Sequence, residues 1–166
     1  MWYGPAIGPF EREGFLDSTL RAAPTAAPLR PSVTLEAFIP TGARALYGLV
    51  GFTVHARDDR TVRLVVPYCG DLGNSWTDSL ARKFDDVRIG LPAQYADAVL
   101  GGATAAATGR SPSATIEVVE AAHGAVGSSR ALFAKLAMSA VELLTDEGPR
   151  DDEQLAAFLS SNLRTF

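Results

Sequence analysis

The stretch IGLPAQYADAVLGG, residues 89–102, decides the fold expected for this chain. It carries a proline at position 92, which suits the first turn of a helix because that turn needs no partner for its backbone N–H. Tyr95 and Val99 follow at helical spacing, and Gly109 is placed to end the helix as its C′ residue. The stretch therefore predicts a strand that leads directly into a helix.

Strand-like segments lie on both sides of this helix. The expected strands are residues 33–37, 49–56, 61–67, 84–90 and 114–121. The second and third of them are expected to pair as a β-hairpin, because the four residues between them are polar and form turns readily.

A second helix is expected from the serines at 128–129, since a serine can cap the first free N–H groups of a helix. Its broad apolar stripe runs from Phe133 to Leu144, and Gly148-Pro149 is expected to end it. Asp151 is placed to cap a last helix. The inward-facing residues expected on that helix are Leu155, Phe158, Leu159 and Leu163.

The resulting fold class is α+β. We expect a split β-α-β sandwich with a roughly four-stranded sheet, two helices packed on one face, an N-terminal arm and a C-terminal helix. Residues 1–31 hold half of the ten prolines and are interpreted as the arm, with one short helical turn near 17–22. Residues 32–166 are interpreted as one domain. Aromatic residues in the arm indicate that it packs either on its own domain or on a neighbouring subunit, as in a homo-oligomer.

Composition narrows the classes of function. The net charge of −4 argues against a free-standing nucleic-acid binder, which usually shows a basic footprint. Cys69 is the only cysteine, so an intramolecular disulfide or a cysteine-rich zinc site is not expected. A cytoplasmic location is expected, and no apolar run is long enough to span a bilayer.

Three stretches, in order, carry a resemblance to a known family. Residues 42–50 are glycine-rich and hold Tyr47 and Gly48. Residues 91–102 have the spacing Leu-Pro, Tyr, Ala-Val, Gly. Residues 123–133 combine a histidine, a valine, a Ser-Ser pair and a phenylalanine. Together they resemble domain IV of the elongation factor G family over about residues 36–145.

That resemblance implies a domain whose tip enters the ribosomal decoding site, with the tip formed by two loops, 42–48 and 123–127. The binding residues implied are Gly42, Arg44, Tyr47, Gly48, His123, Gly124, Gly127, Ser128 and Ser129. Leu46 stands where the family has glutamine, and Gly127 stands where it has an acidic residue, so the tip has lost polar groups.

The function expected from the resemblance is a non-catalytic binding or assembly module that acts on the ribosome, in translation, or on a protein partner. The chain holds no phosphate-binding loop of the GTPase kind, so no GTP hydrolysis is expected. No cofactor, no metal and no membrane partner is expected, and the acidic net charge disfavours nucleic acid.

A second interpretation uses the same helix start. The segment 124–129 could hold an anion on free backbone N–H groups, and it resembles the phosphate loop of the GHMP small-molecule kinases. It would then serve a small-molecule or phosphate-binding protein or enzyme. A helix cap with a tight turn explains the same residues without a ligand, and the sequence identifies no acid to orient a Ser–His pair.

Overall fold

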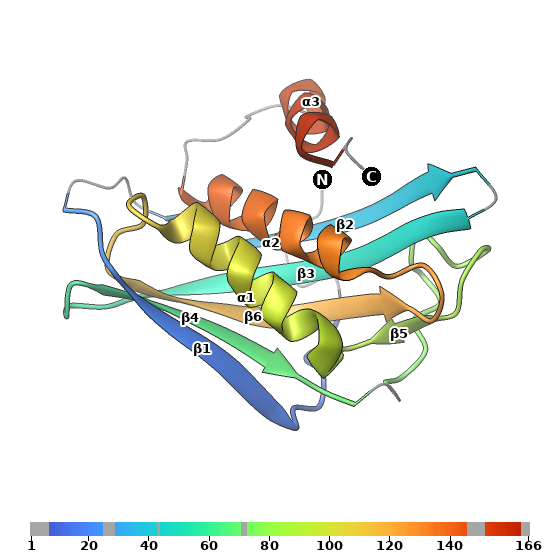
Figure 1. The fold of residues 1–166 in the computed structure, drawn as a ribbon, viewed down its shortest axis with the longest axis horizontal. Coiled ribbons are helices and arrows are strands. Elements are labelled where there is room, and N and C mark those ends of the chain that lie inside the picture. Colours follow the sequence, from blue (N-terminus) through green and yellow to red (C-terminus); the bar gives the residue numbers. More distant parts are fainter. Residues whose placement is uncertain (1–6, 25–28, 43, 71–72, 146–151, 164–166) are drawn as a thin grey trace.

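One mixed β-sheet organises the chain in the computed structural model (Figure 1), which describes residues 7–24, 29–42, 44–70, 73–145 and 152–163. The strands are β1 (Gly14–Arg21), β2 (Ser32–Thr41), β3 (Arg44–Ala56), β4 (Thr61–Tyr68), β5 (Val87–Ile89) and β6 (Ala114–Gly124). Their order is β1-β4-β6-β3-β2, and β5 pairs with β6 off this path. The α+β class is confirmed, although the sheet has six strands within the described residues rather than roughly four.

The expected hairpin between β3 and β4 is wrong. β6 lies between these two strands, antiparallel to β3 and parallel to β4. The β4-α1-β6 unit is also not split, because its two parallel strands are direct neighbours. The polar turn at 57–60 fits a tight hairpin or a wider connection equally well. β6 is the central strand of the sheet. It is buried along one face over its whole length and on both faces from Glu120 to its end, as a central strand must be.

The helical turn expected near residues 17–22 is also wrong, because residues 17–21 lie in β1 and Ala22 follows directly after it. β1 pairs antiparallel with β4 along its whole length, so it is an edge strand of the same sheet as the rest of the chain. Leu16 and Leu20 pack against the main core. Their spacing of four residues fits a helix and a strand alike, and pairing with β4 decides between them.

Two helices cover one face of the sheet, as expected (Figure 1). They are α1 (Ala93–Ala107) and α2 (Arg130–Thr145), and α3 (Asp152–Leu163) packs on α2. Gly109 has a φ of +71° just after α1, which fits the expected C′ position. The hydroxyl oxygen of Ser129 accepts a hydrogen bond from Leu132 N at 3.2 Å and caps α2 as expected.

The apolar face expected for the last helix is confirmed. Leu155, Phe158, Leu159 and Leu163 are partly buried against the main core. The expected helix end at Gly148-Pro149 and the expected cap at Asp151 lie outside the described residues.

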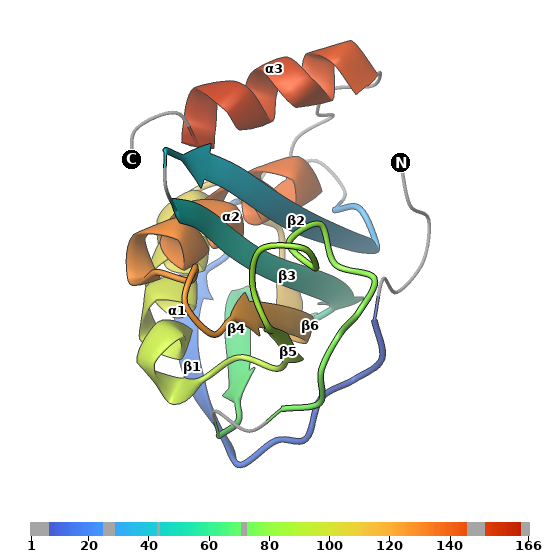
Figure 2. The ribbon, with the colours of Figure 1, turned by 90° about the vertical axis from the view of Figure 1, so that its right-hand side faces the viewer.

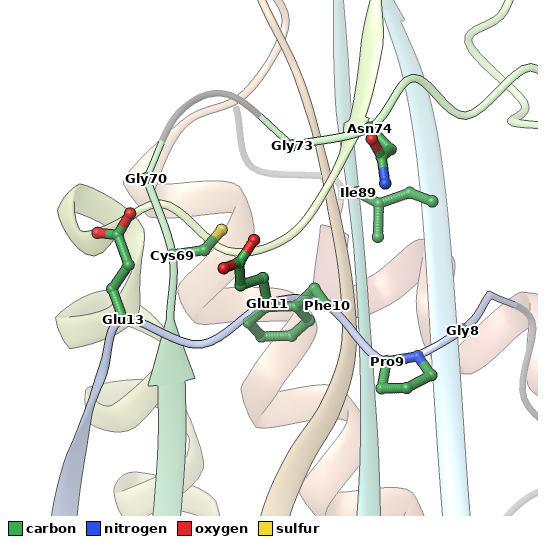
Figure 3. Close-up of a pocket in the computed structure, with 10 residues that line it drawn as sticks. All are labelled: Gly8, Pro9, Phe10, Glu11, Glu13, Cys69, Gly70, Gly73, Asn74 and Ile89. Atoms are coloured by element: carbon green, nitrogen blue, oxygen red, sulfur yellow. The ribbon is translucent and has the colours of Figure 1, made fainter.

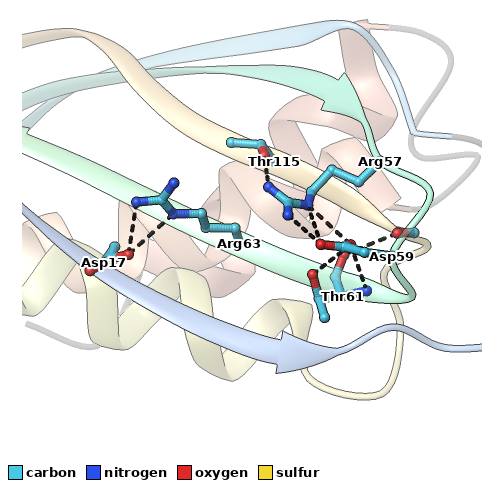
Figure 4. Close-up of polar contacts among 7 residues, drawn as sticks. Asp17, Arg57, Asp59, Thr61, Arg63 and Thr115 are labelled. Atoms are coloured by element: carbon cyan, nitrogen blue, oxygen red, sulfur yellow. Dashed lines mark hydrogen bonds and ion pairs between the residues drawn. The ribbon is translucent and has the colours of Figure 1, made fainter.

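Among the residues that the structure describes, those that cover the opposite face of the sheet lie at one end of it. There a small second core of Tyr47, Leu49, Val87 and Ala122 lies beneath Ile7 and the loop of residues 73–86 (Figure 2). The remainder of this face carries charged and polar side chains on neighbouring strands (Figure 4). The ion pairs on it are Asp17–Arg63 at 3.0 Å, Arg12–Glu117 at 2.7 Å and Arg57–Asp59.

Candidate functional site

The two expected tip loops, 42–48 and 123–127, meet at the right-hand end of the sheet in Figure 1, and we keep the name tip loops for them. They are only partly loops, because β3 begins at Arg44 and β6 runs to Gly124. Tyr47 N donates to Gly127 O at 2.9 Å, which joins one loop to the other. The hydroxyl of Ser128 donates to Tyr47 O at 2.7 Å and accepts from Gly124 N at 2.9 Å. These backbone contacts fix the two loops relative to each other.

The outer part of the first tip loop projects into solvent. Gly42 has a φ of +74° at the turn between β2 and β3, a left-handed conformation that glycine adopts without strain. Arg44 is exposed at the start of β3, and its carbonyl accepts from the hydroxyl of Thr41 at 3.2 Å. Arg44 and Tyr47 are three positions apart along the strand, a distance of roughly 10 Å. Only the inner residues of this loop therefore touch the second one.

Five of the expected binding residues are buried: Tyr47, Gly48, His123, Gly124 and Gly127. The hydroxyl of Tyr47 donates to a carboxylate oxygen of Glu36 at 3.1 Å, and burial, with the charge of Glu36, raises the pKa of this phenol far above its usual value. A Cβ on Gly48 would lie 3.0 Å from a methyl group of Leu136. These residues shape the tip from inside and do not form its surface.

His123 faces the helices. Its Nδ1 lies 3.1 Å from Gly90 O, and because a carbonyl only accepts, this nitrogen carries the proton. Its ring lies 6.4 Å from that of Tyr95 on α1. The hydroxyls of Ser128 and Ser129 also form hydrogen bonds with backbone groups. The serines and the histidine of the candidate Ser–His pair are therefore each bonded to the backbone.

Asp85 supplies an anion to the second tip loop. Its Oδ2 accepts from Gly127 N at 2.7 Å, and its two carboxylate oxygens lie 3.2 and 3.3 Å from Val126 N. A Cβ on Gly124 would come within 2.1 Å of Oδ2, and one on Gly127 within 2.9 Å. Both glycines are therefore needed for this approach. We call this contact the Asp85 latch.

The latch was missed because the sequence pattern places Asp85 inside the expected strand 84–90. The strand in the structure, β5, is shorter and begins at Val87. The usable signal was the Asp85-Asp86 pair, since aspartate is depleted in strands and common where turns approach free N–H groups.

An exposed apolar patch lies beside the tip loops. The ring of Phe84 stacks on that of Phe38 in β2 with 5.2 Å between centroids, and Phe84 is 72% exposed. Leu80 and Val126 are also exposed, and Leu80 N donates to Glu36. The sequence did not predict this patch, because its residues come from three segments that only the fold brings together.

A separate pocket of about 290 Å³ lies between the N-terminal segment and the loop after β4 (Figure 3). Glu11 and Glu13 stand at its rim, and Cys69 lines it. Cys69 is buried, and a Cβ on Gly90 would come within 2.4 Å of its sulfur. Two carboxylates make this pocket unfavourable for an anion.

Within the described ranges, no group of three or more His, Cys, Asp or Glu side chains could hold a metal ion. In the same ranges no helix has the length and apolar character needed to cross a membrane. No protein-family model matches the chain, and no curated protein matches it.

Proposed function

We propose that this chain is a non-catalytic binding or assembly module that contacts the ribosome through the tip loops and the apolar patch beside them. The observation that carries the proposal is the joining of the two loops by backbone hydrogen bonds next to an exposed aromatic pair. The resemblance of three ordered stretches to domain IV of elongation factor G is the reason for proposing the ribosome as the partner.

Local charge at this end of the molecule supports an RNA-rich partner. Arg44, Arg82 and Lys83 are exposed, and none of them makes an ion pair within the residues that the structure describes. Of the neighbouring acids, Asp85 binds backbone N–H groups, Asp86 pairs with Arg88 at 2.5 Å, and Asp78 is exposed. Arg44, Arg82 and Lys83 are therefore exposed cations that RNA phosphates can contact, although the net charge of the chain is −4.

Cations and exposed aromatic rings are what an RNA surface requires. Lysine and arginine neutralise phosphates, and an unstacked base can lie on an aromatic face. Phe84 offers such a face. With about three phosphate contacts, binding should be modest and should weaken steeply as salt rises.

Co-sedimentation with ribosomes tests the proposal. The wild-type chain should pellet with ribosomes at low salt and be released at high salt. The double variant Arg82→Glu/Lys83→Glu and the variant Phe84→Ala should each bind more weakly. Arg110→Glu at the far end of α1 is the matched control and should bind as wild type. No association at low salt would remove the ribosomal function.

The alternative, a phosphate-type ligand at Gly124–Ser129, would have to displace the Asp85 latch. Thermal shift with inorganic phosphate and nucleotides separates the two proposals, because a ligand that binds only the native state raises the melting temperature. A shift that grows in Asp85→Asn would favour the ligand. A chain that binds ribosomes without any such shift favours the module.

A further inference from the structure

β1 leaves one edge of the sheet open. It is the terminal strand in the order β1-β4-β6-β3-β2, and in Figures 1 and 2 no described element packs beyond it. An unpaired edge is a template for another strand. The other edge strand, β2, contains Pro40, whereas β1 contains no proline and so keeps a donor at every residue.

The backbone groups that face this open edge can be identified. Ala22 N donates to Arg60 O at 3.0 Å, which continues the β1–β4 register by one residue. Because N–H and C=O groups alternate sides along a strand, the even-numbered residues point to β4. The odd-numbered residues Asp17, Thr19 and Arg21 therefore turn their backbone groups outward.

The side chains of the same odd-numbered residues are exposed and carry opposite charges. Asp17 pairs with Arg63, and both side chains stay more than 40% exposed. Arg21 makes no ion pair in the part of the chain that the structure describes. Asp17 and Arg21 lie two positions before and two positions after Thr19, so opposite charges are placed at equal distances from Thr19.

This placement matches β1 to a second copy of itself. A two-fold axis through Thr19 sets Asp17 opposite the partner subunit's Arg21, and the reverse, with the outward backbone groups in hydrogen-bonded pairs. An axis through Asp17 would set two carboxylates against each other. An axis through Ser18 would set Asp17 opposite the partner's Thr19 and form no ion pair. Charge therefore selects the register centred on Thr19.

We propose that two copies of this chain form a symmetric dimer by antiparallel pairing of their β1 strands about Thr19. The two sheets become one continuous sheet, and the half-buried Leu16 and Leu20 gain cover from the partner copy. β1 and the β2–β3 hairpin lie on opposite edges of the sheet, so this inference stands apart from the proposed function of the tip.

Sedimentation velocity from about 1 µM to about 1 mM tests the dimer, a range that covers weak to moderate association. The wild-type chain should convert from monomer to dimer. Arg21→Glu sets a carboxylate opposite the carboxylate of Asp17. Because contact between like charges is unfavourable, the dissociation constant should rise by about tenfold or more. Arg44→Glu makes the same charge change at the β2–β3 end of the sheet and should dimerise as wild type.

Cysteine cross-linking tests the register. Hydrogen-bonded antiparallel partners have Cα atoms about 5.5 Å apart, within the range that a disulfide spans. Thr19→Cys should therefore form a covalent dimer on mild oxidation. Phe15→Cys is the control, because about eight residues of strand, roughly 26 Å, would separate the two cysteines.

A chain that stays monomeric up to the highest concentration overturns the proposal. Equal cross-linking of Phe15→Cys and Thr19→Cys overturns it as well, and so does an Arg21→Glu variant that dimerises as tightly as wild type. Circular dichroism of every variant confirms that loss of the dimer is not loss of the fold.

Discussion

Removing the carboxylate of Asp85 should destabilise the chain more than removing the charge of a neighbouring surface residue does. Asp85→Ala leaves the buried Gly127 N–H and the exposed Val126 N–H without their acceptor. A bond to a charged acceptor contributes about 1.5–3 kcal/mol, and the Val126 N–H can be taken over by water. The expected loss is therefore about 2–3 kcal/mol, or about 4–12 °C in melting temperature for a chain of this size.

Urea unfolding followed by circular dichroism measures this loss. Asp85→Asn keeps one acceptor oxygen and should cost about half as much. Asp86→Ala, the matched control, removes only an exposed pair with Arg88 and should cost about 0–1 kcal/mol. If Asp85→Ala and Asp86→Ala unfold at the same urea concentration, the latch does not hold the second tip loop in solution.

Three further predictions concern the core and its charges. Gly102→Ala should destabilise the chain, because its Cβ would lie 2.1 Å from a carbonyl oxygen of α2, whereas Gly101→Ala meets nothing within 4 Å and should stabilise it by up to about 1 kcal/mol in the same urea assay. Tyr47 has a raised pKa through burial, so the unfolded chain gains by ionising it above pH about 10; wild type should lose stability there relative to Tyr47→Phe, and parallel curves from pH 8 to 11 would contradict this. The hydrogen bond from Arg130 lowers the pKa of Asp97, so Asp97→Asn should cost under about 1 kcal/mol at pH 7. That difference should vanish as pH falls through the folded pKa, and a difference that persists in acid would count against the pair.

Local patterns predicted the helices well. Pro92 was expected as the first residue of α1 and is its N-cap, one residue earlier, while Gly109 follows the end of the helix. Their backbone preferences act within one turn, and Ser129 caps α2 for the same reason. These features depend on residues close in sequence, so the sequence alone is sufficient to find them.

The pairing of the strands was less predictable. The strands β3 and β4 were located, yet the turn between them carries no information about the strand that inserts between them. β1 was misread for a related reason, since Leu16 and Leu20 fit two periodicities and only β4 distinguishes them.

The sequence pointed to the glycines and serines of the second tip loop, but it did not predict their contacts with Asp85 and with the first tip loop. A Cβ on Gly124 would meet Asp85, and a Cβ on Gly127 would meet first the carbonyl oxygen of Ala45 and then Asp85. These atoms come from distant positions in the chain, so no local pattern of this kind encodes the contacts. Tyr47 and His123 were expected at a surface and lie inside.

The sequence by itself therefore determined where helices begin and end and which segments are extended, because backbone propensity and side-chain period act over a few residues. Only the tertiary structure decided which strands are neighbours, which carboxylate fills the loop before α2, and that β1 ends the sheet with opposite charges at equal distances from Thr19. Each of these depends on burial and hydrogen bonding between distant segments, whose partners exist only once the chain has folded.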